Sequence, residues 1–142
     1  MGISKATAQW EGTLKNGKGT MKPAHASDVT FTAGTRFEGQ PGSNPEEMIG
    51  AALAGCFSMA LSAGLERAGA QPKSIRTSAD VTIEREPSGF TIKVIALTTE
   101  VEASGIDAQK FQEVATATKS GCPVSKALAA VPSVTLNATL KP

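Results

Sequence analysis

The 142-residue sequence has little of several residue types, and each shortage excludes a class of function. It contains two cysteines, one histidine and no tyrosine, and aromatic residues make up 4% of the chain. Because one histidine and no C-x-x-C motif leave too few ligands for a zinc cluster, we predict no metal site. No nucleotide or flavin motif occurs either, so we predict no cofactor. The 14 basic and 13 acidic residues contain no basic run, which argues against a nucleic-acid partner and an anionic membrane surface.

Charge is also missing from one long stretch, residues 48–65, which contains no Asp, Glu, Lys or Arg. Its beginning has the signals of a helix start, because Ser43 or Asn44 can cap the backbone and Pro45 fits the first turn. A glycine followed by a proline three residues later marks the end. We predict a buried helix of about 24 residues over residues 45–69, around which the rest of the chain is organised.

Glycine and alanine dominate this helix, and charged residues flank it, so we do not predict a membrane span. Its small residues would let a second helix approach closely. They are Gly50, Ala51, Ala54 and Gly55.

The remaining segments alternate in hydrophobicity like strands or show helical spacing. Strands are predicted over residues 4–11, 19–22, 28–35, 76–86, 90–102 and 133–140, and a second helix is predicted from Asp107 to residue 130 with a break at Cys122. This order indicates a single α+β domain over residues 1–142, with antiparallel β-sheets wrapped around the long central helix.

The two cysteines, Cys56 and Cys122, lie 66 residues apart. Because the N-terminus lacks an apolar signal region, we expect a cytoplasmic protein. In a reducing compartment a transient, redox-active bond between the two thiols is favoured over a permanent disulfide. The alternative is that both are inert, since an isolated cysteine is usually a small buried hydrophobe.

A cysteine thiol with a pKa near 8.5 reacts only as the thiolate, which requires a positive field. Cys122 precedes Pro123 at a helix start, where free N–H groups and the helix dipole supply that field. Cys56 lies about 12 residues into its helix, roughly 18 Å from the end, where the dipole has faded. It therefore needs an external cation, and Arg36 is the candidate in the flanking segment.

Glu46 could hold that arginine in place, although it would also serve simply as a first-turn partner of the helix dipole. Glu46 and Cys56 are about 15 Å apart along one helix, so one arginine could hardly bridge both within a chain. In a homodimer, the equivalent glutamate of an antiparallel neighbouring helix could reach that arginine.

Three stretches of the sequence resemble the OsmC/Ohr family of thiol-dependent peroxidases, and within it the OsmC branch. They are residues 35–42 (TRFEGQPG), residues 43–61 with Cys56 near the end, and residues 121–128 (GCPVSKAL). All three occur in order, and the resemblance covers essentially the whole chain.

The resemblance implies an intertwined homodimer with active sites built from both subunits. It implies that Cys56 attacks the peroxide, that Cys122 resolves the sulfenic acid to a Cys56–Cys122 disulfide, and that Arg36 and Glu46 activate the thiolate. A dithiol reductant of unknown identity would then reset the pair. The apolar residues near Cys56 favour organic hydroperoxides over hydrogen peroxide as substrates.

Two other functions remain open at this point. The same disulfide could switch a partner-facing surface in a redox sensor without sustained turnover. Alternatively, the dimer could bind an apolar ligand and contain two inert cysteines.

Overall fold

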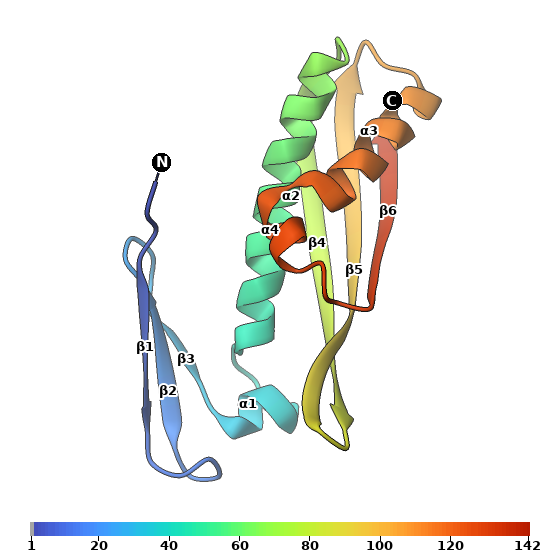
Figure 1. Cartoon of the computed structure of the whole chain (residues 1–142). Coiled ribbons are helices and arrows are strands. Elements are labelled where there is room, and N and C mark those ends of the chain that lie inside the picture. Colours follow the sequence, from blue (N-terminus) through green and yellow to red (C-terminus); the bar gives the residue numbers. More distant parts are fainter. Residues whose placement is uncertain (1) are drawn as a thin grey trace. The chain divides into compact units, whose positions relative to one another are not determined.

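The structure is a computed structural model that describes residues 2–142 (Figure 1). The chain divides into two compact units, Met1–Met48 and Ile49–Pro142, and each is described by itself. That the two units form a single domain stays a prediction.

The first unit contains a three-stranded antiparallel sheet in the order β1-β2-β3. Its strands are β1 (Ala6–Glu11), β2 (Lys18–Pro23) and β3 (Val29–Phe31). Trp10 and Phe31 pack across this sheet with ring centroids 5.6 Å apart. Most of β1 is exposed, so the sheet has little core of its own.

The predicted third strand, residues 28–35, is wrong in its second half. β3 ends at Phe31, and a short helix, α1 (Ala33–Phe37), follows. Thr32 and Thr35 form a capping box, because each hydroxyl accepts the backbone N–H of the other residue, at 3.1 and 3.0 Å. These side-chain bonds favour a helical turn over the strand that the alternating pattern indicates.

The predicted central helix is confirmed as α2 (Pro45–Arg67), 23 residues long. It begins where the Asn44 side chain accepts the N–H of Glu47 at 2.8 Å, so Asn44 is the cap. It ends two residues before Gly69, whose φ of +87° lies in the left-handed region that glycine adopts readily.

The second unit has a mixed sheet in the order β4-β5-β6, made of β4 (Gln71–Glu86), β5 (Gly89–Ser104) and β6 (Ser133–Lys141). β4 and β5 form the predicted antiparallel hairpin, but β6 pairs parallel to β5, so the prediction of purely antiparallel sheets is wrong. The connection between β5 and β6 explains their parallel pairing. Helices α3 (Ala108–Gly121) and α4 (Pro123–Ala127) carry the chain back along the sheet before β6 begins (Figure 1).

Helices α2 and α3 contribute to one apolar core with β5. On α2 the buried side chains recur every fourth residue and form one face. The fully buried apolar side chains from these three elements are Leu53, Phe57, Leu61, Leu65, Ile95, Leu97, Val101, Phe111 and Ala115. A window of α2 has a mean hydropathy of 1.7, so by length and composition alone it could cross a membrane. Since its Leu/Phe face is buried in this unit, α2 is a partly buried core helix.

The opposite side of α2 is exposed in the chain. Met59 is 80% exposed, and Ala52 and Gly55 are exposed beside it. Gly50, by contrast, faces the chain's own sheet, because a Cβ there would lie 3.2 Å from the Ala79 carbonyl oxygen. The small-residue surface predicted for a second helix therefore includes Gly55 but not Gly50.

A chain of hydroxyl groups ties α2 to the sheet two residues beyond Cys56. Ser58 donates to Thr77 at 2.8 Å, and the Thr77 and Thr99 hydroxyls are 2.9 Å apart. Thr99, which is fully buried, donates to the Arg76 carbonyl at 3.2 Å. These bonds satisfy the buried hydroxyls and fix the rotation of α2, which sets the direction of Cys56.

Candidate active site

The second unit brings Cys56 and Cys122 together, and both are free thiols. Cys56 projects from the middle of α2, while Cys122 lies at the break between α3 and α4. Cys122 is 1% exposed, and Cys56 is partly buried. The two thiols are close enough for each to shift the pKa of the other.

Cys122 ends α3 and caps α4, as the sequence predicted, although α4 stops at Ala127 rather than residue 130. Its Sγ accepts the Ser125 N–H at 3.4 Å and lies 2.9 Å from the Ser125 hydroxyl. Burial opposes ionisation, but the bonds from Ser125, with contributions from Cys56 and Val124, lower the pKa of Cys122 below the usual value.

For Cys56, the effects that raise the pKa outweigh those that lower it. Burial raises the pKa of its thiol, a backbone hydrogen bond from Val124 offsets part of the rise, and Cys122 raises it further. Within the second unit, Cys122 is therefore the more acidic thiol. This agrees with the expectation that Cys56 needs a cation from elsewhere.

The first unit brings the other two predicted residues together. Arg36 on α1 binds Glu46 in the first turn of α2: Nε donates to the two carboxylate oxygens at 3.1 and 3.2 Å, and Nη2 donates at 2.6 Å. Glu46 is 5% exposed, so the ion pair is buried on its acidic side. The Arg36 guanidinium also lies 5.1 Å from the ring centroid of Phe37. The arginine is thus held in one orientation by its own chain's glutamate.

A cavity of about 410 Å³ lies beside Arg36 in the first unit. Its walls are mainly apolar and are formed by Trp10, Gly12, Leu14, Phe31, Thr32, Ala33 and Phe37 as well as Arg36. An apolar cavity with one charged group at its wall fits a small molecule that has an apolar body and a polar end.

In the structure, Arg36 pairs with Glu46 in the first unit, and Cys56 lies near Cys122 in the second unit. Sequence reasoning missed Ser125 and Trp10. The helix break at Cys122 was a signal for Ser125, because the third residue after a cap is the one whose N–H the cap accepts. Within residues 2–142 no group of three or more His, Cys, Asp or Glu side chains is arranged to hold a metal ion.

The chain is similar in sequence and in fold to known proteins. The model of the OsmC-like protein family matches residues 37–137, a range that includes Glu46, Cys56 and Cys122 and begins one residue after Arg36. The chain is 48% identical over 139 residues to peroxiredoxin OsmC of Escherichia coli (strain K12), with 96% of each chain covered.

Solved structures agree in fold. The OsmC-like protein of Mycoplasma pneumoniae has a TM-score of 0.76 at 15% identity, with 98% of this chain and 97% of that chain covered. The organic hydroperoxide resistance protein OhrB of Bacillus subtilis has a TM-score of 0.66 at 26% identity, with 96% of this chain and 98% of that chain covered. The chain belongs to the OsmC-like protein family.

Proposed function

We propose that this protein is a thiol-dependent peroxidase that reduces organic hydroperoxides and, more weakly, hydrogen peroxide. The observation that carries the proposal is the pair of free, interacting thiols, Cys56 and Cys122, in a chain 48% identical to a peroxiredoxin. Such a pair can pass from sulfenic acid to disulfide and back with no cofactor.

In the first step the Cys56 thiolate attacks the terminal oxygen of the hydroperoxide. The O–O bond breaks, the alcohol leaves with a proton, and Cys56 becomes a sulfenic acid. The Cys122 thiolate then attacks the Cys56 sulfur, water leaves, and a Cys56–Cys122 disulfide forms. The lowered pKa of Cys122 supports this role, because a larger share of it is thiolate at neutral pH.

Arg36 is assigned to the Cys56 thiolate and to the peroxide oxygen that becomes negative as the O–O bond breaks. Its support is the buried Glu46 carboxylate, which fixes the guanidinium through three hydrogen bonds. Glu46 would act as a positioning residue, since an arginine already oriented loses less freedom when it binds the transition state.

We further propose that the working enzyme is a homodimer, as the family resemblance implies. Two surfaces of the chain support this. The side of α2 with Met59 and Gly55 is apolar and exposed, and nothing lies within 4 Å of a Cβ built at Gly55. The β1-β2-β3 sheet has little core of its own. Both surfaces would gain from burial against a second copy.

The preference for organic hydroperoxides is supported by the cavity beside Arg36, whose Trp10, Phe31 and Phe37 side chains suit an alkyl or aryl tail. Hydrogen peroxide has no tail to bury there, so we expect it to react more slowly. Competition between cumene hydroperoxide and hydrogen peroxide for limiting reduced enzyme tests this, and faster consumption of hydrogen peroxide would contradict it.

A dithiol must return the disulfide to two thiols, and we propose the cytoplasm as the site of this cycle. A reducing compartment supplies the thiols that the cycle needs to return a transient disulfide to two thiols.

The central test is dithiothreitol-driven consumption of cumene hydroperoxide by wild type, Cys56→Ser and Cys122→Ser, with mass spectrometry after one equivalent of peroxide. Wild type should turn over continuously and form one intramolecular disulfide. Cys56→Ser should lose the activity completely and leave Cys122 reduced. Cys122→Ser should accumulate a trappable sulfenic acid on Cys56.

The outcomes separate the alternatives. A wild type that consumes one equivalent and stops despite excess dithiothreitol would be a redox sensor. A wild type whose thiols do not react would be a dimer with inert cysteines. Oxidation of Cys122 in Cys56→Ser at the wild-type rate would reverse the two assigned roles.

A further inference from the structure

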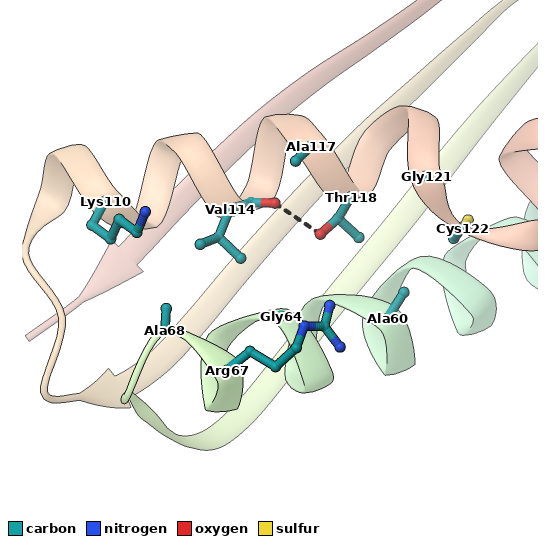
Figure 2. Close-up of a pocket in the computed structure, with 10 residues that line it drawn as sticks. All are labelled: Ala60, Gly64, Arg67, Ala68, Lys110, Val114, Ala117, Thr118, Gly121 and Cys122. Carbon is teal, nitrogen blue, oxygen red and sulfur yellow. Dashed lines mark hydrogen bonds between the residues drawn. The ribbon is translucent and has the colours of Figure 1, made fainter.

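A cavity of about 430 Å³ lies in the second unit, where residues of α3, α4 and the segment before β6 meet α2. It shares no lining residue with the cavity beside Arg36 or with a groove between α2 and α3 that ends at Cys122 (Figure 2). Neither cysteine lines this cavity, and the proposed peroxidase cycle gives it no role.

The cavity has a large apolar wall. The residues that form it are Leu53, Leu128, Val131 and Val134. Leu53 on α2 is 1% exposed, and the other three pack against the core that contains it. Two backbone hydrogen bonds of 3.0 Å, from the Leu128 N–H to the Val124 carbonyl and from the Val131 N–H to the Leu128 carbonyl, fix the turns between α4 and β6. The apolar wall therefore belongs to the packed part of this unit.

The polar part of the lining is positively charged. Lys119 from the last turn of α3 and Lys126 from the last turn of α4 both line the cavity, and no carboxylate among residues 2–142 does. Neither lysine has an ion-pair partner in this range. Lys119 is only partly exposed, so the cost of removing its ammonium group from water is not offset by a counter-ion of the chain.

We propose that this cavity binds a single apolar chain that ends in a carboxylate, such as a free fatty acid. The carboxylate contacts Lys119 and Lys126, and the exposed hydroxyl of Ser120 is a further donor. The chain lies against the leucine and valine side chains. An inorganic anion would leave that wall unused, and a neutral ligand would leave both lysines without a counter-ion.

The other two cavities lack this combination. Figure 2 shows that the groove between α2 and α3 has two cations, Arg67 and Lys110, but its wall on α2 consists of small residues and offers little apolar surface. The cavity beside Arg36 is apolar, but that arginine is already paired with Glu46. We therefore expect an anionic chain to select the cavity with the two lysines.

The test compares octanoate, octanol and octylammonium, which have the same chain length and differ in the charge of the end group. Each is titrated into the full chain under reducing conditions, and dissociation constants are taken from the shifts of backbone amide NMR signals. Octanoate should bind on the order of tenfold more tightly than octylammonium at low salt, with octanol between them. The amides of Ser120 and Val131 should shift, and the indole N–H of Trp10, in the cavity beside Arg36, should not.

Chain length tests the apolar wall. Hexanoate has the same carboxylate but fewer methylene groups to bury, so it should bind about tenfold more weakly than octanoate. Val131→Thr exchanges a methyl group of the wall for a hydroxyl and should weaken octanoate and octanol alike.

The lysines are tested by charge removal. Lys119→Gln and Lys126→Gln should each weaken octanoate binding by about threefold and leave octanol binding unchanged. Lys110→Gln is the matched control, because it removes the same charge from α3 at a position outside this cavity. It should change neither dissociation constant.

Equal affinities of wild type for octanoate and octylammonium would overturn the proposal, and so would equal affinities for octanoate and hexanoate. A preference for octanoate that survives in Lys119→Gln and Lys126→Gln but is lost in Lys110→Gln or Arg36→Gln would also overturn it, because the anion would then occupy another cavity. These measurements use no peroxide, so their outcome is independent of the proposed peroxidase cycle.

Discussion

The two units of the chain divide the proposed chemistry between them in an uneven way. Among residues 2–142 the fully buried apolar side chains all lie in the second unit, which also contains both thiols. The first unit contains the Arg36–Glu46 ion pair and a three-stranded sheet with little apolar core. The sulfurs proposed to react thus lie on a well-packed scaffold, whereas the cation assigned to them belongs to a unit that buries little of its own apolar surface.

This difference teaches that stability and reactivity need not have the same source. Packing of α2 against β5 fixes where Cys56 and Cys122 lie, but burial raises the pKa of Cys56 and works against its reaction. A buried nucleophile therefore requires a cation that packing alone does not supply. Substitutions in the two units should accordingly affect different measurements.

The largest stability effect should come from the core of the second unit. Leu61→Ala removes a fully buried side chain of α2 and should lower the free energy of unfolding by about 3 kcal/mol, as core leucine truncations commonly do. Denaturant unfolding at fixed protein concentration measures this.

The same substitution in the first unit is the control. Leu14 is 69% exposed, so Leu14→Ala should change the free energy of unfolding by less than about 0.5 kcal/mol. An equal loss in both variants would break the comparison, because it would mean that the first unit buries Leu14 against a second copy.

Arg36→Gln should differ from Leu61→Ala in producing a large change in rate. It should also lower the free energy of unfolding, because it leaves the buried Glu46 carboxylate without its cation. Loss of a donor to a developing negative charge commonly costs about a hundredfold in rate, and that is the decrease expected for cumene hydroperoxide. The pKa of the Cys56 thiol should also rise relative to wild type, so its alkylation at neutral pH should slow.

Arg36→Lys is the matched variant, because it keeps the positive charge but lacks the planar guanidinium with its paired donors. It keeps the cation but cannot reproduce the two-pronged contact with Glu46, so it should recover part of the activity. An Arg36→Gln enzyme with a normal rate and a normal Cys56 pKa would remove Arg36 from the site.

Sequence patterns predicted those features of the two units that depend on how single residues restrict the backbone near them. The bounds of α2 followed from a capping residue, Pro45 and Gly69, and the break at Cys122 followed from Pro123, because these residues restrict the backbone around them. The parallel pairing of β6 could not be read in this way, because an alternating strand carries no information about the direction of its neighbour.

The side-chain partners were harder to predict than the elements. The α1 helix depends on reciprocal bonds between Thr32 and Thr35, which compete with a strand-like pattern and prevail. The ion pair of Arg36 with Glu46 of the same chain depends on how α1 is placed before α2. Its assignment to a Cys56 thiolate stays a prediction, as does the homodimer.

The smallest predicted effect concerns the difference in pKa between Cys56 and Cys122 within the second unit. Ser125→Ala removes the hydroxyl that lies 2.9 Å from Cys122 but keeps the backbone N–H, so the pKa of Cys122 should rise relative to wild type. Because the wild-type pKa is lowered, the variant should have less Cys122 thiolate at neutral pH and should form the disulfide more slowly, while attack on peroxide by Cys56 is unchanged. Ultraviolet thiolate absorbance against pH in a Cys56→Ser background measures the shift without interference from the other thiol. A shift in the opposite direction, or none, would mean that the acidity of Cys122 comes from the backbone donors of α4 alone, and that the serine serves only to begin that helix.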